Sequence, residues 1–300
     1  MIVPGLVLTL VACLSSPLTN FELDSSPKET IVGHDFVSNT DIVREEGLTE
    51  YAIGSRILEP FFPEGGGDAV PNSIFGNDDR VFIDDDQYSD FPYRTICLIY
   101  ITYDFNDDGI RETTRVGTGC LVGPDVVVTA AHLVYDAQHS DWGYCTVMPG
   151  GHFDDNNNLV TPYGSYQVTF TWKGNNATTN DSNDDWALLR IEEKVGNEIG
   201  YLGVGSSLIS VGTDVRLYGY HSDVPNRLAY GPGEVTALYP YKFYHNCDAL
   251  SGSSGGPITF GTVIVVGIHS GGVNSYNDVA CRITDTLVSY IEGMIEEANQ

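Results

Sequence analysis

The sequence GSSGGP, residues 252–257, decides how the rest of the chain is interpreted. It predicts a strained turn that presents the hydroxyl of Ser254 between glycines, which tolerate backbone angles that other residues avoid. In such a turn the amides of Gly252 and Ser254 can point together at a developing oxyanion. A Gly/Ser-rich turn is by itself more often an ordinary loop, so its interpretation depends on the residues upstream.

Two upstream motifs supply the partners that a nucleophilic serine needs. VVVTAAH ends at His132, where a β-branched strand turns into a loop, and DDWALL begins with Asp184 and Asp185. The order His, Asp, Ser is one of three known chain orders for a nucleophilic triad. A serine hydroxyl is a weak nucleophile until a base removes its proton, and we assign that role to His132. An orienting aspartate should directly precede the apolar strand, which favours Asp185 over Asp184.

The distribution of apolar residues predicts an all-β fold. Short Val/Ile/Thr-rich runs separated by turns fill residues 94–193, and a second set follows from residue 214 to residue 284. Two such groups on either side of a connector at 196–205 predict two antiparallel barrels. Residues 285–297 are expected to form a helix, because four apolar residues fall on one face of it: Leu287, Ile291, Met294 and Ile295.

Charge and composition exclude some partners. The 300 residues include 41 Asp and Glu against 14 Lys and Arg, a formal net charge of −27. The excess is spread along the chain, so the protein should repel nucleic acid and anionic membrane surfaces. The acids serve either solubility or, for some of them, calcium binding.

The N-terminal region is expected to be removed in steps. Residues 5–14 form an apolar run that is too short to span a bilayer but suits a signal peptide over residues 1–16. The protein is then secreted, or alternatively anchored by a lipid on Cys13. Residues 17–72 are polar and punctuated by proline and glycine, which indicates a propeptide ending near Asn72–Ser73 or an extension that is never processed.

One loop has the composition of a calcium site. In DFNDDG, Asp104, Asn106 and Asp108 alternate, and Gly109 allows a sharp turn. Arg115 stands where a complete EF-hand loop needs a bidentate glutamate. The loop is therefore either a calcium-binding hairpin or an acidic turn, and no other cofactor is expected.

These motifs resemble the trypsin/chymotrypsin-fold serine endopeptidases, and within them the bacterial glutamyl endopeptidases. The resemblance covers residues 73–297 and depends on TAAH, DWALL and GSSGGP, with SIFGNDDR at 73–80, FPYR at 91–94 and GIHSGG at 267–272. It implies two six-stranded barrels, an N-terminal one over 73–195 and a C-terminal one over 196–300. It also implies a monomeric secreted zymogen that acts on polypeptides.

The resemblance further implies a pocket for an acidic side chain. His269 in GIHSGG would line it, and the new amine of Ser73 would help to bind the substrate after activation. A carboxylate that enters a pocket needs donors or positive charge to replace its water, and an imidazole supplies one donor.

Two positions depart from the family pattern. Ala249 stands where the family has a hydroxyl residue, which Ser251 or Ser270 would have to replace. Asp248 lies six positions before Ser254, where an acid in trypsin-like enzymes binds Lys or Arg. Cleavage after Glu or Asp is the preferred prediction, and cleavage after basic residues is the alternative.

Five cysteines follow Cys13 and, in an exported protein, are expected to form disulfides. Cys247 and Cys281 bracket the serine turn, and Cys120 and Cys145 bracket the histidine loop. Cys97 is then either free or in competition for Cys120.

Two classes of function fit these features. The first is acyl transfer by a secreted serine endopeptidase. The second is a non-catalytic binding module on the same scaffold, which a fluorophosphonate that reacts with an activated serine would separate from the first.

Overall fold

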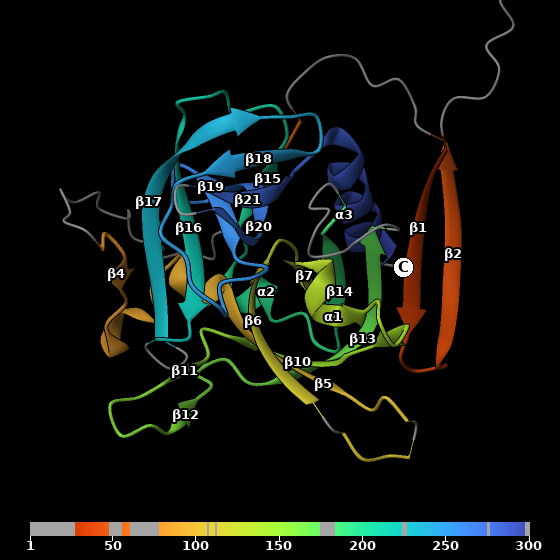
Figure 1. Cartoon of the computed structure of the whole chain (residues 1–300). Coiled ribbons are helices and arrows are strands. Elements are labelled where there is room, and N and C mark those ends of the chain that lie inside the picture. Colours follow the sequence, from red (N-terminus) through yellow and green to blue (C-terminus); the bar gives the residue numbers. More distant parts are fainter. Residues whose placement is uncertain are drawn as a thin grey trace, which may run out of the picture.

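Two closed antiparallel β-barrels form the body of the protein in the computed structural model (Figure 1). The structure describes residues 28–47, 56–60, 78–106, 108–111, 113–174, 184–223, 227–274 and 277–297. The predicted signal peptide and Cys13 lie outside these residues. The prediction of an all-β chymotrypsin-like fold with a C-terminal helix is confirmed.

The N-terminal barrel has six strands in the order β10-β5-β6-β7-β14-β13 and is closed by pairing of β10 with β13. The strands are β5 (Ile96–Tyr103), β6 (Thr113–Leu121), β7 (Val126–Thr129), β10 (Tyr144–Pro149), β13 (Tyr166–Gly174) and β14 (Ala187–Ile191).

The C-terminal barrel has the order β19-β16-β17-β18-β21-β20 and is closed by pairing of β19 with β20. Its strands are β16 (Asp214–His221), β17 (Arg227–Leu238), β18 (Lys242–His245), β19 (Pro257–Phe260), β20 (Ile264–Asn274) and β21 (Asn277–Arg282).

Short elements connect and flank the barrels. They are the helices α1 (Ala131–Val134) and α2 (Gly196–Ile199), the 3-10 turns Asp85–Gln87 and Tyr93–Thr95, and the strands β4 (Val81–Phe82), β8 (Tyr135–Asp136), β9 (Asp141–Trp142), β11 (His152–Phe153), β12 (Leu159–Val160) and β15 (Gly203–Gly205). The expected connector at 196–205 thus contains α2 and β15.

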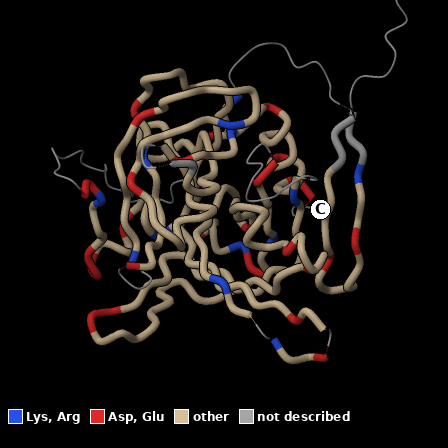
Figure 2. The backbone as a smooth tube through the Cα atoms, viewed as in Figure 1, with Lys and Arg blue, Asp and Glu red and all other residues tan. Residues whose placement is uncertain are grey.

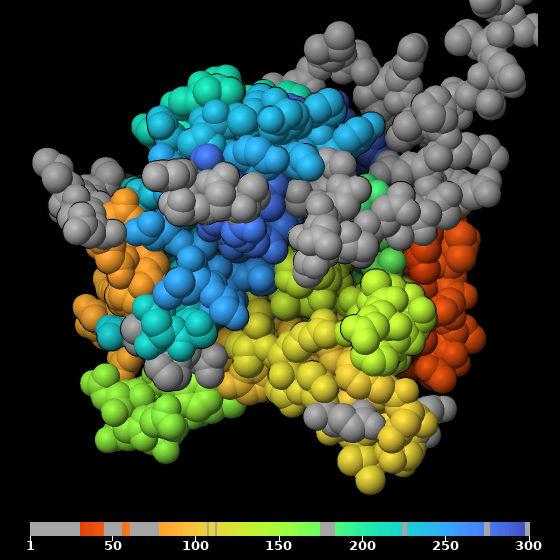
Figure 3. All heavy atoms as spheres, viewed as in Figure 1, coloured from red at the N-terminus to blue at the C-terminus, as the bar shows by residue number. Residues whose placement is uncertain are grey.

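One hydrophobic cluster spans both barrels and a second fills the C-terminal barrel, which explains why their strands are apolar on both faces. Every residue of β7 is buried, because inward side chains fill the barrel and outward ones are covered. The cluster that contains Val128 continues through Tyr218 and Tyr220 of β16 to Ile291 of the C-terminal helix. In the space-filling view the two barrels meet across the middle of one face (Figure 3).

The C-terminal helix α3 (Asp285–Glu297) has the predicted bounds. Its apolar face packs on the N-terminal barrel, where Tyr290 stacks on Trp186 with ring centroids 5.6 Å apart. Three residues of the predicted face are fully buried and the fourth packs against the same core: Leu287, Ile291, Met294 and Ile295. No helix in the described part of the chain has the length and apolar character needed to cross a membrane.

The described part of the predicted propeptide, residues 17–72, contains three strands. The hairpin of β1 (Lys28–Asp35) and β2 (Thr40–Gly47) extends the N-terminal sheet, since β1 pairs with β13. Strand β3 (Ile57–Leu58) pairs with β15 beside the C-terminal barrel. The hairpin stands at the edge of the molecule in Figure 1. Whether this region is cleaved from the enzyme stays a prediction.

The expected disulfides are absent from the described residues, where five cysteines are buried and none is bonded to another: Cys97, Cys120, Cys145, Cys247 and Cys281. Strand register is the reason. Cys120 lies opposite Ile96 of β5 and Cys145 opposite Ile101, five residues or about 17 Å along the strand. A disulfide tolerates a Cα separation of at most about 7 Å.

The second pair is separated in the same way. Cys281 pairs with Lys242 at the start of β18, whereas Cys247 follows the other end of that strand at His245. Cys247 instead lies against Gly233 of β17.

Among the described residues, the positions of Asp and Glu are scattered along the backbone of both barrels, as the sequence predicts (Figure 2).

Candidate active site

His132 and Asp185 come together although 53 positions separate them. His132 lies in α1 directly after β7, and Asp185 lies just before β14, which pairs with β7. The ring Nδ1 of His132 is 2.8 Å from Oδ2 of Asp185, and the backbone N–H of His132 donates to Oδ1 at 2.9 Å. Asp185 has no exposed surface, so its carboxylate is dedicated to these bonds.

This arrangement fixes the state of the ring. A carboxylate only accepts hydrogen bonds, so the proton of a neutral His132 sits on Nδ1 and Nε2 keeps its lone pair. Asp184 does not take this place, and its backbone carbonyl accepts the N–H of Trp186 at 2.9 Å.

The turn that holds Ser254 depends on two glycines with left-handed backbone angles. Gly252 has φ +97° and Gly255 has φ +80°. A Cβ on Gly255 would lie 2.1 Å from Oγ1 of Thr129 and 2.2 Å from the carbonyl oxygen of Thr118. The backbone after Ser254 thus packs directly on β6 and β7, the strands that lead to His132.

Thr118 of β6 joins the two barrels at this point, and nothing in the sequence motifs pointed to it. Its N–H donates to the carbonyl of Ser254 at 2.9 Å, and its Oγ1 donates to the carbonyl of Gly252 at 2.8 Å. The same Oγ1 accepts the N–H of Tyr220 at 3.0 Å. Thr118 therefore holds the serine turn of one barrel against a strand of the other.

Two amides in the turn are available to a ligand. The N–H groups of Ser253, Gly255 and Gly256 donate to backbone carbonyls, whereas within the described part of the chain those of Gly252 and Ser254 donate to none. These are the two amides that the sequence predicts for an oxyanion hole. Among the described residues, the hydroxyl of Ser254 makes no hydrogen bond to His132.

His269 lies directly behind the serine turn. Its N–H donates to the carbonyl of Gly256 at 2.9 Å, and its carbonyl accepts the N–H of Gly255 at 2.8 Å. Burial, and then the charges of His245, His132 and His221, hold the pKa of His269 well below its usual value. A neutral imidazole beside the serine turn can donate one hydrogen bond to a substrate.

The structure places two of the other three residues predicted to line the pocket. Ser270 is buried, and among the described residues its Oγ has no partner. Ala249 packs against the core of the C-terminal barrel. Ser73 lies outside the described residues.

Asp248 lies among other carboxyl groups. Its Oδ2 accepts the N–H of Asp79 at 3.1 Å. Burial, and then a hydrogen bond and the charge of Asp248, raise the pKa of Asp79 to about 6. Burial and the charge of Asp248 also raise the pKa of Asp278 to about 6.

In the predicted calcium loop, the side-chain oxygens accept hydrogen bonds from the backbone of the loop itself. Asp104 Oδ2 accepts the N–H of Gly109 at 2.8 Å, and Asp108 Oδ1 accepts the N–H of Ile110 at 2.8 Å. Asn106 Oδ1 accepts the N–H of Asp108 at 3.1 Å. These bonds account for the turn, and calcium binding stays a prediction.

Comparison with known proteins agrees with this geometry. Residues 117–268 match the family of trypsin-like peptidase domains, which is half of the chain. A glutamyl endopeptidase of Bacillus licheniformis is 29% identical over 191 residues, covering 62% of this chain and 54% of the relative. An extracellular metalloprotease of Bacillus subtilis is 29% identical over 232 residues, covering 74% and 69%. The chain thus spans about half the length of the first of these relatives.

A solved structure of a Glu endopeptidase has the same fold. It superposes with a TM-score of 0.62 at 23% identity and covers 75% of this chain and 100% of that chain. The chain belongs to the trypsin-like peptidase family, the serine endopeptidases built on two six-stranded β-barrels.

Proposed function

We propose that the protein hydrolyses peptide bonds with Ser254 as nucleophile, His132 as base and Asp185 as the group that orients the base. The observation that carries this proposal is the pairing of His132 Nδ1 with the buried carboxylate of Asp185. That pairing leaves Nε2 with the lone pair that must accept the proton of Ser254. As the ring becomes positively charged, the same carboxylate stabilises it.

The reaction is an acyl transfer in two halves. Ser254 attacks the peptide carbonyl, its proton moves to His132, and the oxyanion is held by the amides of Gly252 and Ser254. His132 then protonates the leaving amine. Water releases the acyl group from Ser254 by the same steps in reverse.

We propose that the enzyme cleaves after Glu, or Asp, rather than after Lys or Arg. The neutral ring of His269 offers a donor next to the serine turn. Against this stands Asp248, which would attract a basic side chain. One of its oxygens is already engaged by the amide of Asp79. Burial and the charge of Asp248 raise the pKa of Asp79 and of Asp278 to about 6, so protonation of these two carboxyls lowers the negative charge around Asp248 only as the pH falls toward 6.

We also propose that the protein is exported and made as a zymogen that becomes active on cleavage near Asn72–Ser73. The substrates are then polypeptides outside the cell, and the new amine of Ser73 adds positive charge near an acidic side chain. This processing is read from the sequence and from the family resemblance. A fluorophosphonate that labelled unprocessed and processed chains equally would contradict it.

The most direct test is digestion of a peptide library by the processed protein, with Ser254→Ala as the inactive control. The proposal predicts cuts after Glu and Asp, no cleavage by the variant, and fluorophosphonate labelling at Ser254. Cuts after Lys and Arg would overturn the acidic specificity and leave the triad intact. Absence of both labelling and cleavage would favour a binding module.

A further inference from the structure

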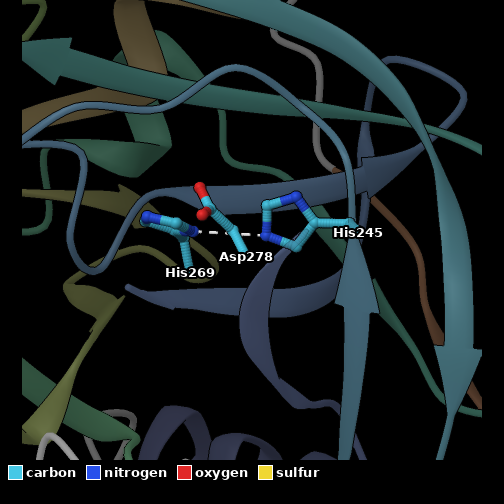
Figure 4. Close-up of side chains that lie close together, drawn as sticks. All are labelled: His245, His269 and Asp278. Carbon is cyan, nitrogen blue, oxygen red and sulfur yellow. Dashed lines mark hydrogen bonds between the residues drawn. The ribbon is translucent and has the colours of Figure 1, made fainter. Parts of the chain in front are cut away.

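His245 lies next to His269 in a group that the sequence motifs did not include. It ends β18, whereas His269 lies in β20, and β21 pairs with both strands. Nε2 of His245 is 3.3 Å from Nδ1 of His269, and Asp278 of β21 stands beside both rings (Figure 4). His245 has no exposed surface and therefore cannot touch a substrate itself.

The backbone fixes which nitrogen of His245 carries the proton. The N–H of Cys247 lies 3.3 Å from Nδ1 of His245. A backbone amide can only donate, so Nδ1 must accept and carries no proton. Burial holds the pKa of His245 at about 3, so the ring is neutral and its single proton sits on Nε2.

The tautomer of His245 in turn fixes the tautomer of His269. Nε2–H of His245 donates to Nδ1 of His269, so Nδ1 of His269 carries no proton either. The proton of a neutral His269 then sits on Nε2, the nitrogen on the side of the ring away from Nδ1. The order Cys247 N–H, His245, His269 thus gives both hydrogen bonds the same direction, away from the backbone of Cys247.

We propose that His245 is a positioning residue for specificity: it holds His269 in the tautomer whose Nε2–H donates to the carboxylate of an acidic substrate side chain. This inference rests on the proposed cleavage after Glu. Without the donor at His245, His269 is free to move its proton to Nδ1. Its Nε2 would then present a lone pair to the carboxylate and repel it.

Zinc is the other chemistry that this group suggests. The ligand atoms of His245, His269 and Asp278 all lie within 4.8 Å of one another, as three zinc ligands would. A metal on Nε2 of His245 would place the remaining proton on Nδ1, facing the N–H of Cys247. Two donors would then oppose each other, so the position of the Cys247 amide favours the tautomer relay.

Two variants of His245 separate its donor from its bulk. His245→Gln keeps both functions, because its carboxamide oxygen can accept from Cys247 and its NH2 can donate to His269. His245→Met fills similar space and has no donor. His152→Gln is the control, since His152 is also buried but lies in β11, outside the group of His245, His269 and Asp278, and stacks on Tyr88 with ring centroids 3.6 Å apart.

The kinetic readout is the ratio of kcat/KM for peptides that differ only in Glu or Gln before the cleaved bond. Counting active sites with a fluorophosphonate corrects for any misfolded fraction. His245→Met should lower this ratio by about ten- to a hundredfold, mainly through KM, the value of one hydrogen bond to a charged group. His245→Gln and His152→Gln should stay within about threefold of the wild type. An equal loss in the Gln and Met variants of His245, or no loss in either, would overturn the proposal.

A spectroscopic test does not depend on cleavage. Nitrogen-15 NMR of histidine-labelled Ser254→Ala protein should show His269 with a protonated Nε2 and an unprotonated Nδ1. The reverse assignment would overturn the proposal even in an enzyme that cleaves after Glu. Stoichiometric zinc in the purified protein, lost in the His245→Met variant, would overturn it in favour of a metal site. If the NMR result holds and the wild type does not cleave after Glu, the proposed specificity fails and the relay loses its role there.

Discussion

The carboxylate of Asp185 binds both the ring and the backbone of His132, at 2.8 Å from Nδ1 and 2.9 Å from the amide nitrogen. The residue is thus held by its main chain as well as by its side chain. The backbone bond anchors the carboxylate beside His132, so its other oxygen stays in place to bind Nδ1 and orient the ring.

Replacement of Asp185 by Asn should lower kcat by about 10⁴-fold with little change in the fold. The Asn amide would donate toward Nδ1 of His132 and force the proton to Nε2, which removes the base. Steady-state kinetics on a peptide substrate measures the effect. Asp184→Asn, one position earlier, should stay within about threefold of wild type. A similar loss of kcat in both variants would show that removal of a negative charge near this strand, rather than loss of the pairing with His132, causes the effect.

Gly255→Ala should destabilise the protein by about 3 kcal/mol or more and abolish activity. Its Cβ would clash with Thr129 Oγ1 and the Thr118 carbonyl, which must move apart. Gly261→Ala is the matched control, because Gly261 has φ +64° but nothing within 4 Å of its Cβ position. The control substitution should lower the free energy of unfolding by about 1 kcal/mol, because alanine disfavours this backbone angle. Equal midpoints of urea unfolding in the two variants would contradict the clash.

His245 should make the protein less stable at acidic pH. Its pKa is about 3 in the folded state against an ordinary 6.5, so between these values the unfolded chain binds a proton that the folded chain does not. Its contribution to stability is complete above pH 6.5 and is lost as the pH falls toward 3. Urea unfolding of His245→Gln should therefore lose less stability between pH 6.5 and pH 4 than the wild type. Parallel pH curves for the two proteins would contradict the burial of a neutral ring.

Gly33→Val should detach the β1–β2 hairpin from the N-terminal barrel. A Cβ at Gly33 would lie 2.5 Å from the ring of Trp172 and 2.8 Å from the carbonyl of Thr171. Limited proteolysis within residues 28–47 should become about tenfold faster, because a protease cuts the hairpin when it has detached from the barrel. Val37→Ala, at an 80% exposed position of the hairpin turn, should leave the rate unchanged. Equal rates in both variants would show that the hairpin is not held through Gly33.

Reducing agent should not change the stability of the protein. The five cysteines from Cys97 to Cys281 are buried and none is bonded to another, so dithiothreitol has no bond to break among them. A structural disulfide would contribute about 2–5 kcal/mol, which its reduction would remove. Urea unfolding with and without dithiothreitol checks this, together with thiol alkylation before and after unfolding. A urea midpoint that falls in dithiothreitol would show that a disulfide does stabilise the protein.

The strand pattern and the local motifs could be predicted because each depends on neighbouring residues. Period and composition indicated the strands of both barrels, and the apolar face of 285–297 gave α3 with the observed bounds. The glycines of GSSGGP indicated a turn with unusual backbone angles, which Gly252 and Gly255 adopt. The hairpin at 28–47 was missed, because a proline- and glycine-punctuated region has a weak pattern and gains its strands by pairing with β13.

The predicted cysteine pairings were wrong for a related reason. Cysteines that bracket a motif in the sequence are separated by strand register in the fold, as Cys120 and Cys145 are along β5.

The sequence by itself determined the fold class and nominated His132, Asp185 and Ser254, because local periodicity and short motifs record backbone preferences. Only the tertiary structure decided that Thr118 holds the serine turn across the barrels and that His245 stands next to His269. Those contacts join residues of different strands, and their distances follow from register and barrel closure. No spacing along a single chain encodes that information.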